Sequence, residues 1–157
     1  MNTARRMLAV SAAAALTAGT IAIAPAAQAA AMHMTPKLWH VYTTAGDGPH
    51  RVDPGGTYDH CEGVTQIYLK VRVTHAHADR PFKVIWTQDG TRVDRYSASY
   101  ATSGTVTDWF AHPRNAMKAQ TGRGLVATLS DGTYKVVFKQ GGRKVGGNKM
   151  TLESTVC

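Results

Sequence analysis

The histidines are the side chains whose spacing most readily suggests chemistry. The chain has seven of them, and His75 and His77 are separated by one residue. On an extended strand their imidazoles would lie on one face, about 6.5–7 Å apart. Two imidazoles at that spacing can share a Zn²⁺ or Cu²⁺ ion if a neighbouring strand supplies a third ligand. The alternation of the preceding residues also predicts that His75 faces inward at the end of its strand. This pair therefore predicts a copper or zinc site.

A second cluster, Met32-His33-Met34, combines one imidazole with two thioethers. Thioethers are soft ligands that suit Cu(I). The alternative for this segment is a frayed chain terminus, and the alternative for His75 and His77 is a pair of polar residues at the end of a strand. No third ligand for His75 and His77 is evident from the sequence, so both interpretations stay open.

Basic side chains are concentrated near the C-terminus, in a predicted hairpin. They are Lys135, Lys139, Arg143, Lys144 and Lys149. The summed field of such a surface attracts anionic polymers. The alternative is that lysines on an exposed strand block edge-to-edge aggregation and keep the protein in solution. No aromatic side chains are interleaved with these charges as a stacking platform, so the pattern predicts no specific nucleic-acid partner.

The acidic residues do not form a catalytic pattern. The chain has two glutamates, Glu62 and Glu153, and several aspartates precede glycine in predicted turns, as in Asp89-Gly90 and Asp131-Gly132. No serine lies in a Gly-x-Ser-x-Gly elbow, and no glycine-rich phosphate loop leads from a strand into a helix. We therefore expect a protein that is not an enzyme and that needs no cofactor, apart from the copper or zinc considered above.

The N-terminal residues have the composition of an export signal. Arg5-Arg6 precedes a mostly apolar run from Met7 to Ala24, and Ala27-Gln28-Ala29 provides small residues for a cleavage site. This order predicts a secretory signal peptide over residues 1–29. The remaining residues, 30–157, are enough for a single domain. No other apolar run approaches the length that spans a membrane, so we expect a secreted, extracellular protein.

Export makes disulfide formation the expected state of the two cysteines, Cys61 and Cys157. A bridge between them would enclose most of residues 30–157. Closing a loop of about 100 residues stabilises a protein by roughly 4–5 kcal/mol in the chain-entropy account. The sequence thus predicts one disulfide.

Apolar residues alternate with polar ones over much of residues 30–157. The clearest segments are Ile67–Val73, Phe82–Trp86 and Tyr134–Phe138, each of which presents one apolar face. Weaker or shorter strands are expected at 38–42, 105–110 and 125–129, a final strand at 150–156, a short helix at 113–120, and a long Gly/Pro-rich irregular loop at 43–63. Asp-Gly and Gly-Gly pairs predict tight turns, and Gly146-Gly147 predicts a bulge. This pattern predicts an all-β antiparallel sandwich of about seven or eight strands.

Two segments resemble parts of immunoglobulin-type domains. Val84–Gly90 is similar to the strand that carries a core tryptophan before a tight turn, and Asp131–Tyr134 is similar to the corner before the penultimate strand. The resemblance implies that Trp86 and Tyr134 lie in the core and that the tyrosine hydroxyl bonds to nearby backbone. It implies an immunoglobulin-like β-sandwich but no particular ligand.

Together these patterns predict a secreted, non-enzymatic binding protein. Its partner is expected to be an extracellular protein or an anionic envelope polymer. Contact would be made through the basic C-terminal hairpin or through the loops at 43–63 and 111–123, because a rigid sandwich commonly presents function on its connections. Two alternatives are an extracellular copper- or zinc-binding protein and a secreted protease inhibitor with a protruding loop held by the disulfide.

Overall fold

The computed structural model describes residues 30–113 and 128–156. Within these ranges the protein is all-β, as the alternation predicted, and contains no helix. The predicted signal peptide at 1–29, nearly all of the helix predicted at 113–120, and Cys157 lie outside the described residues.

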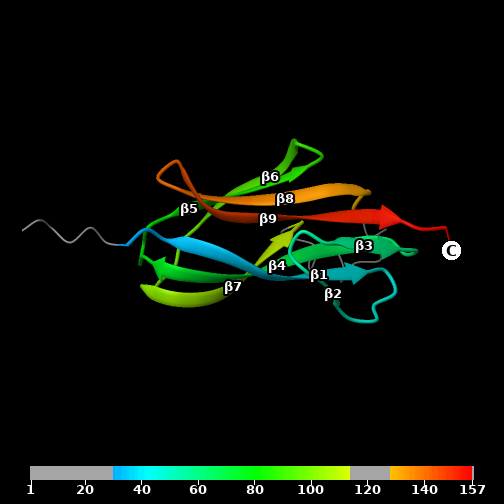
Figure 1. The fold of residues 1–157 in the computed structure, drawn as a ribbon, viewed down its shortest axis with the longest axis horizontal. Coiled ribbons are helices and arrows are strands. Elements are labelled where there is room, and N and C mark those ends of the chain that lie inside the picture. The colour runs from blue at the N-terminus through cyan, green and yellow to red at the C-terminus, as the bar shows by residue number, and fades with distance from the viewer. Residues whose placement is uncertain (1–29, 114–127, 157) are drawn as a thin grey trace, which may run out of the picture.

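Nine strands follow one another in the described part of the chain (Figure 1). They are β1 (His33–Thr43), β2 (His50–Val52), β3 (Thr57–His60), β4 (Val64–Ala76), β5 (Phe82–Gln88), β6 (Thr91–Ala98), β7 (Gly104–His112), β8 (Gly132–Gln140) and β9 (Arg143–Ser154). The segments with the clearest alternation form β4, β5 and β8, which confirms those three predictions. Of the weaker strand predicted at 125–129, the described part contains only residues 128 and 129, and Leu129 makes an isolated bridge to Val64.

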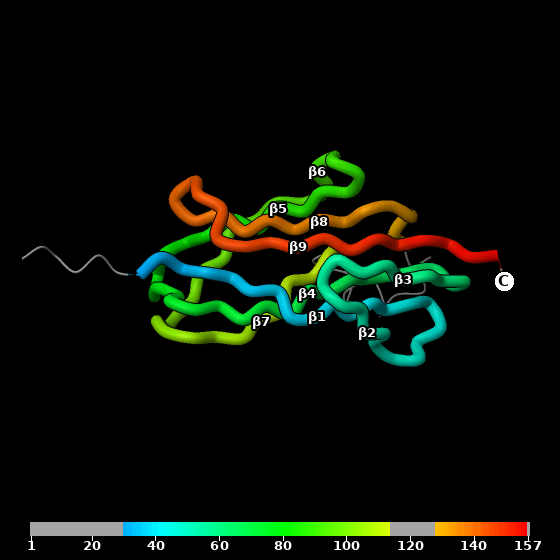
Figure 2. The backbone as a smooth tube through the Cα atoms, viewed as in Figure 1, coloured from blue at the N-terminus to red at the C-terminus, as the bar shows by residue number. Residues whose placement is uncertain are grey.

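The strands form one hydrogen-bonded path that doubles back on itself. Its order is β6-β5-β8-β9-β1-β4-β7, with β2 beside β1 and β3 beside β9. Figure 1 shows β5, β6, β8 and β9 in the upper part of the view and β1, β2, β4 and β7 in the lower part. The parallel pairing of Met34 with Gly146 connects the two groups. Figure 2 shows that the start of β1 and the β8–β9 turn lie at one end of the molecule, and that β9 finishes at the other.

The pairing is mixed, so the prediction of purely antiparallel strands is wrong. β9 runs parallel to both β1 and β3. The loop predicted at 43–63 also contains two short strands. A turn around Pro54 and Gly55 redirects the chain after β2, which pairs with β1, so that β3 adds to the outer edge of β9. Gly55 adopts φ 85°, a left-handed conformation that glycine takes without steric cost.

The core lies between the inner faces of the two strand groups. Trp39 of β1 and Trp86 of β5 are fully buried, with their ring centroids 5.8 Å apart in an edge-on arrangement. Phe110 of β7 and Phe138 of β8 meet with centroids 4.6 Å apart. Such aromatic pairs contribute about 0.5–1.5 kcal/mol beyond the area that they bury. These contacts join strands that are distant in the pairing order, which shows that the two inner faces pack together.

Tyr134 lies in the core at the beginning of β8. Its side chain is buried, and its hydroxyl donates a 2.8 Å hydrogen bond to the carbonyl oxygen of Ser130. Trp86 is also buried. The core positions and the hydroxyl-to-backbone bond that the immunoglobulin-type resemblance implied at these two residues are therefore present.

Gly146 and Gly147 allow two strands to approach β9 closely. A Cβ atom on Gly146 would overlap the carbonyl oxygen of Met34, and one on Gly147 would lie 2.5 Å from that of Val136. The predicted bulge is next to these glycines rather than at them: Phe138 pairs with Gly146 and Lys139 with Lys144, which leaves Val145 as the extra residue. Glycine is needed here because backbone, not a side chain, occupies the space.

Candidate anion-binding face

The basic residues of β8 and β9 lie on the outer face of their sheet. Lys135 and Lys139 are exposed because they alternate with Tyr134, Val136 and Phe138, which are buried in the core. Arg143, Lys144 and Lys149 are exposed as well. The outward orientation predicted for Lys135 and Lys139 is confirmed.

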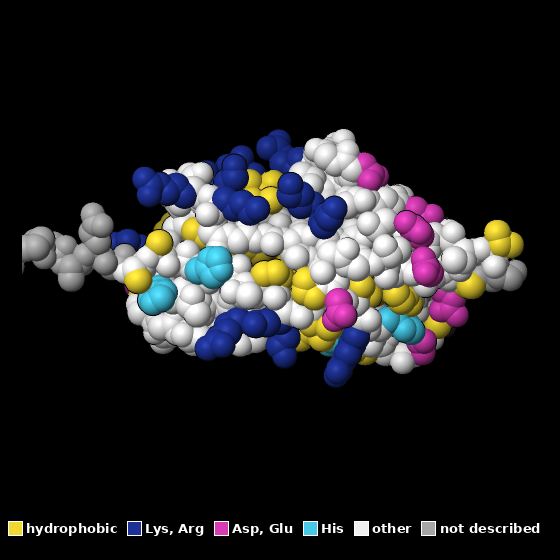
Figure 3. Space-filling model, viewed as in Figure 1, with side chains coloured by type: hydrophobic (Ala, Val, Ile, Leu, Met, Phe, Trp, Pro, Cys, Tyr) yellow, Lys and Arg dark blue, Asp and Glu magenta, His cyan; other side chains and the backbone are white. Residues whose placement is uncertain are grey.

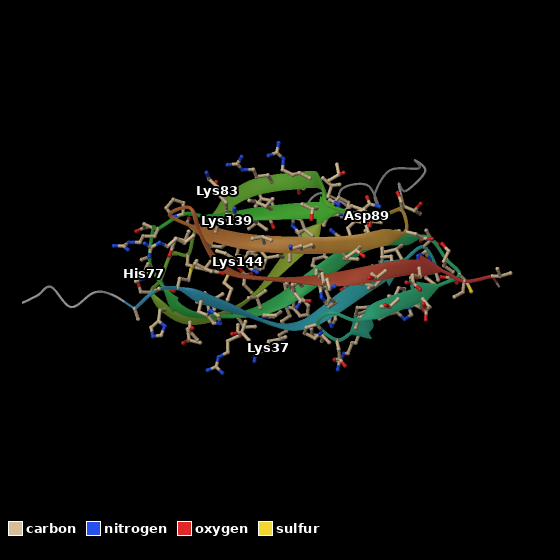
Figure 4. The ribbon with its side chains drawn as sticks, turned by 45° about the horizontal axis from the view of Figure 1, so that its top comes forward. Lys37, His77, Lys83, Asp89, Lys139 and Lys144 are labelled. Atoms are coloured by element: carbon tan, nitrogen blue, oxygen red, sulfur yellow. The ribbon has the colours of Figure 1, made fainter. Side chains whose placement is uncertain are left out.

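Strand pairing adds a lysine from β5 to this surface. Lys83 is opposite Lys139, and Lys139 is opposite Lys144 on its other side. The three side chains therefore form a lysine row that crosses β5, β8 and β9 (Figure 4). Neighbouring strands lie about 4.8 Å apart, so the row places three positive charges within roughly 10 Å of sheet width.

A second row crosses the same face nearer the beginning of β8. Arg92 of β6 pairs with Thr87, Thr87 with Lys135, and Lys135 with Lys149. We call Arg92, Lys135 and Lys149 the arginine–lysine row. The two rows are four residues apart along β8, which corresponds to about 13 Å.

An apolar strip separates the two rows. Ile85 and Val137 are cross-strand neighbours and are half-buried, with Arg95 on one side of them and Gly147 on the other. The two rows and this strip make up what we call the basic face. Figure 3 shows Lys and Arg side chains gathered over the upper strands at one end, and acidic side chains toward the opposite end.

The cations of the basic face do not neutralise carboxylates of the fold. All ten acidic residues of the chain are within the described ranges, and none belongs to either row or to the strip between them. The ion pairs among the described residues are two histidine–aspartate pairs, neither of which involves this face. Like charges directly opposite on neighbouring strands are destabilising. These cations therefore cost the fold free energy instead of stabilising it.

The sequence pattern missed three of the seven cations of this face. Lys83, Arg92 and Arg95 are more than 35 positions from the predicted C-terminal hairpin, and only the pairing of β5 with β8 brings them beside it. The alternation of Lys83 with buried Phe82 and Val84 indicated an outward lysine. It did not indicate which strand would lie next to it.

The lysine row ends beside an open recess of about 970 Å³. We call this the end recess. It is lined by Ala31, Met32, His33, His77, Arg80, Pro81, Gln140, Gly141, Arg143, Lys144 and Val145. Its cationic and titratable side chains come from the start of β1, the β4–β5 connection and the start of β9, and no carboxylate is among the lining residues.

The two histidines that were expected to act together, His75 and His77, have different surroundings in the structure. A register shift between Val73 and Ala76 gives the inward position to Ala76 and leaves His75 exposed, with φ 54°. The prediction that His75 faces inward is therefore wrong, because the irregularity reverses the alternation. His77 instead lies in the end recess, and its Nε2 is 3.1 Å from the carbonyl oxygen of Ala30.

The Met-His-Met segment lies at the beginning of β1, with Met32 directly before the strand and His33 and Met34 as its first residues. Met32 and Met34 are 3% and 1% exposed and belong to the hydrophobic core, whereas His33 is exposed. A frayed terminus is thus the wrong interpretation for these residues. No cluster of three or more His, Cys, Asp or Glu side chains suited to a metal ion occurs within residues 30–113 and 128–156.

Electrostatics at the end recess favour an anion over a metal ion. His33 and His77 both line it, but so do Arg80, Arg143 and Lys144. Three fixed positive charges oppose the entry of a divalent cation and attract an oxyanion. The copper or zinc site at His75 and His77, with Met32, His33 and Met34, stays a prediction.

At the opposite end, charged groups are hydrogen-bonded to the fold. Asp131 accepts a 2.6 Å hydrogen bond from Ser154 Oγ and a 3.1 Å bond from the Ser154 amide, and its other oxygen is 3.1 Å from Nε2 of His60. Asp89 accepts a 2.8 Å bond from the amide of Thr133. We call His60, Asp89, Asp131 and Ser154 the carboxylate corner. The bonds from Ser154 to Asp131 and the neighbouring His60 hold the pKa of that carboxyl below its ordinary value, against a smaller opposing effect of burial.

The carboxylate corner does not have the geometry of a hydrolase. In a nucleophilic triad the hydroxyl bonds to the imidazole, which can then accept its proton. Here Asp131 lies between Ser154 and His60, so the hydroxyl donates to a carboxylate instead. The observed arrangement connects the ends of β3 and β9 with the start of β8, which is a structural role.

Cys61 lies beside this corner, immediately after β3. It is not a free cysteine, and its Sγ is 3.6 Å from the hydroxyl oxygen of Thr155. β3 and β9 run parallel there, with His60 opposite Ser154. Cys157 lies outside the described residues, so the predicted pairing with Cys61 stays a prediction.

The two predicted contact loops differ in what the structure describes. A 2.8 Å bond from the Thr44 amide to the Gly63 carbonyl joins the two ends of residues 43–63, and a 3.0 Å bond from the Gly55 amide to Asn148 Oδ1 anchors the middle of the segment. Most of residues 111–123 lie outside the described ranges. In the part of the chain that the structure describes, no helix has the length and hydropathy to cross a membrane.

Comparison with known proteins adds a distant structural likeness. No protein-family model matches the chain, and no curated protein gives a significant match. Among solved structures, the chain is similar to an immunoglobulin-like protein from Pseudomonas aeruginosa, at 12% sequence identity and a TM-score of 0.42. The match covers 80% of this chain and 99% of that one. What can be said of the fold therefore rests on this chain's own strands and their pairing.

Proposed function

We propose that this chain is a secreted, non-enzymatic binding protein with an immunoglobulin-like sandwich fold, which contacts an anionic polymer of the cell envelope through the basic face. The observation that carries the proposal is the pair of cation rows, none of whose members forms an ion pair with a carboxylate among the described residues. Asp89 lines a hollow with Lys135, but it accepts a hydrogen bond from the Thr133 amide. Charges that weaken the fold slightly and form no ion pair within it are available to an external anion.

The shape of the basic face favours a polymer over a small ligand. The rows extend across three or four strands and are exposed, so they present charges at fixed spacings on a rigid sheet. A small ligand is usually enclosed by a concave pocket, whereas a chain with repeated charges can contact both rows at once. Each additional contact adds to avidity, because it forms within an already bound complex.

The same face lacks the features of a nucleic-acid platform. Its central strip carries the aliphatic residues Ile85 and Val137, and none of the cross-strand partners in its rows is aromatic. Single-stranded nucleic acids bind strongly where bases stack on aromatic rings. An exposed tryptophan does occur, but it is Trp109 of β7, in the other group of strands, with the ammonium of Lys70 5.3 Å from its ring centroid. The sequence-based prediction of export adds that the partner is an envelope polymer.

The test is retention of the secreted protein on an immobilised anionic polymer, with lipoteichoic acid and heparin as two separate probes. The face variant is Lys83→Ser/Lys139→Ser/Lys144→Ser. The matched control, Lys37→Ser/Arg51→Ser/Arg72→Ser, removes the same charge from exposed positions on β1, β2 and β4. We expect the face variant to elute at clearly lower salt than the control on at least one polymer. Equal shifts in the two variants would show that net charge, not the basic face, causes retention.

A further inference from the structure

The end recess adjoins the basic face and is larger than the hollow that contains Lys83 and Lys139. Residues from three separate segments of the chain converge on it: His33 from β1, His77 and Arg80 from the β4–β5 connection, and Arg143 and Lys144 from β9. Met32, Pro81 and Val145 supply apolar wall. From these side chains we propose that the end recess binds a phosphomonoester, and that it holds the phosphorylated end of a polymer lying on the basic face. The second half of this proposal rests on the proposed function.

The lining chemistry fits phosphate better than a singly charged carboxylate. Two guanidinium groups, Arg80 and Arg143, provide planar forks that bind phosphate oxygens in pairs, and Lys144 adds a compact third charge. A phosphomonoester carries about two negative charges at neutral pH and three strong acceptor oxygens. The imidazoles of His33 and His77 are further hydrogen-bond donors. Asp79 precedes Arg80 in the chain but is not part of the lining.

The end recess is continuous with the lysine row. Lys144 belongs to both, and Gly141 lines both the recess and a neighbouring hollow of about 250 Å³ that contains Lys83 and Lys139. An anionic chain that follows the row from β5 to β9 therefore reaches the recess. A repeating diester would contact the row, and its terminal monoester would enter the recess.

The start of the described chain adds to this site. The carbonyl oxygen of Ala30 lies 3.1 Å from Nε2 of His77, and Ala31 lines the recess. Cleavage after Ala29, as the signal-peptide prediction requires, would create a new amino group on Ala30. That group is one more positive charge beside the recess, so the experiments must use secreted protein with its natural N-terminus.

The test uses glycerol 3-phosphate as the monoester probe and glycerophosphoglycerol as the diester probe, titrated into ¹⁵N-labelled protein and followed by NMR. We expect the monoester to shift amides at the start of β1 and in the β8–β9 turn, with the diester binding at least ten-fold more weakly. The recess variant Arg80→Ser/Arg143→Ser should lose at least ten-fold in monoester affinity. The control Arg92→Ser/Lys149→Ser, in the arginine–lysine row, should keep it.

A second variant, His77→Ala, checks that the loss does not come from misfolding, because it removes one donor and leaves the two arginines in place. Its monoester affinity should fall by less than that of the arginine variant. An unchanged monoester affinity in the arginine variant, or equal affinities for monoester and diester, would overturn the inference.

Phosphatase treatment of the polymer separates the two proposals. Loss of retention only in the Lys83/Lys139/Lys144 variant, without monoester binding, would support the face and reject the recess. If the protein binds the monoester but neither the lysine variant nor the arginine variant changes polymer retention, the result would support the recess and reject the face.

Discussion

The two ends of this molecule use their charges in opposite ways. At the carboxylate corner, Asp131 accepts hydrogen bonds from Ser154 and lies 3.1 Å from His60. On the basic face, Lys139 is placed between two other lysines. The carboxylates of the corner are hydrogen-bonded to the fold and connect strands, whereas the cations of the face lie next to like charges and form no ion pair among the described residues.

Under the proposed function, this difference marks the part of the molecule where binding is favoured over stability. A charge that is hydrogen-bonded within the fold contributes to folding and is not available to a ligand. A charge held next to like charges weakens the fold slightly, and under the proposed function this cost is recovered when an anion binds. The comparison predicts that removing charge from the corner destabilises the protein, while removing it from the basic face does not.

The largest effect is expected at the cysteine beside the corner. Cys61→Ser/Cys157→Ser should lower the free energy of unfolding by about 2–5 kcal/mol if the predicted bridge exists, because the unfolded chain regains the freedom that the cross-link removes. Thermal unfolding measures this loss. Ellman's reagent provides the control on the unchanged protein, where two reactive thiols under denaturing conditions without reductant would contradict the bridge.

The second-largest effect is expected from acid, which should reduce the stability that the carboxylate corner contributes. The pKa of Asp131 is lowered in the fold by its bonds with Ser154. A carboxyl whose pKa is lowered in the fold stabilises the fold at pH values above its unfolded pKa of about 3.9. This contribution disappears as the pH falls through the pKa of the folded state. Asp131→Asn should therefore lower the melting temperature at pH 7 and reduce the further loss between pH 5 and pH 3. Glu153→Gln, one residue before Ser154, is the matched control. An acid response of Asp131→Asn as steep as that of the unchanged protein would show that the corner does not depend on this carboxylate.

Local alternation explains why much of the framework could be predicted from the sequence. Phe82, Val84 and Trp86 face one way in any extended strand, and Lys83 must then face the other. The same reasoning placed Lys135 and Lys139 on an outer surface. These are properties of one strand, and a short stretch of sequence contains all the information that they need.

Long-range pairing explains most of what could not be predicted. Lys83 and Lys139 are opposite each other because β5 pairs with β8, and nothing near either residue specifies that partner. The end recess depends on the same kind of information, since it combines residues 33, 77 and 143 from three segments. Irregularities add a second limit: a register shift near Val73 reversed the orientation expected for His75.

A smaller effect tests the hydrogen bond that the immunoglobulin-type resemblance implied. Tyr134→Phe removes the bond to the Ser130 carbonyl and leaves the buried ring in place. The free energy of unfolding should fall by about 1 kcal/mol, the usual net contribution of one such bond. Tyr42→Phe is the control, because no hydrogen bond of its hydroxyl is found among the described residues. Equal changes in the two variants would show that the bond at Tyr134 adds nothing to stability.

The smallest effect has the opposite sign and bears most directly on the comparison. Lys139→Thr removes the central charge of the lysine row, and it should raise the free energy of unfolding by about 0.2–0.5 kcal/mol, since cross-strand pairs contribute on that scale. Arg72→Thr is the matched control, because Arg72 is also exposed but has Thr35 and Thr107 opposite it. The gain at Lys139 should shrink in 0.5 M salt, where exposed charges are screened. A loss of stability at Lys139 as large as at Arg72 would mean that the lysine stem packs favourably on the sheet, and the contrast between the two ends would then not come from charge.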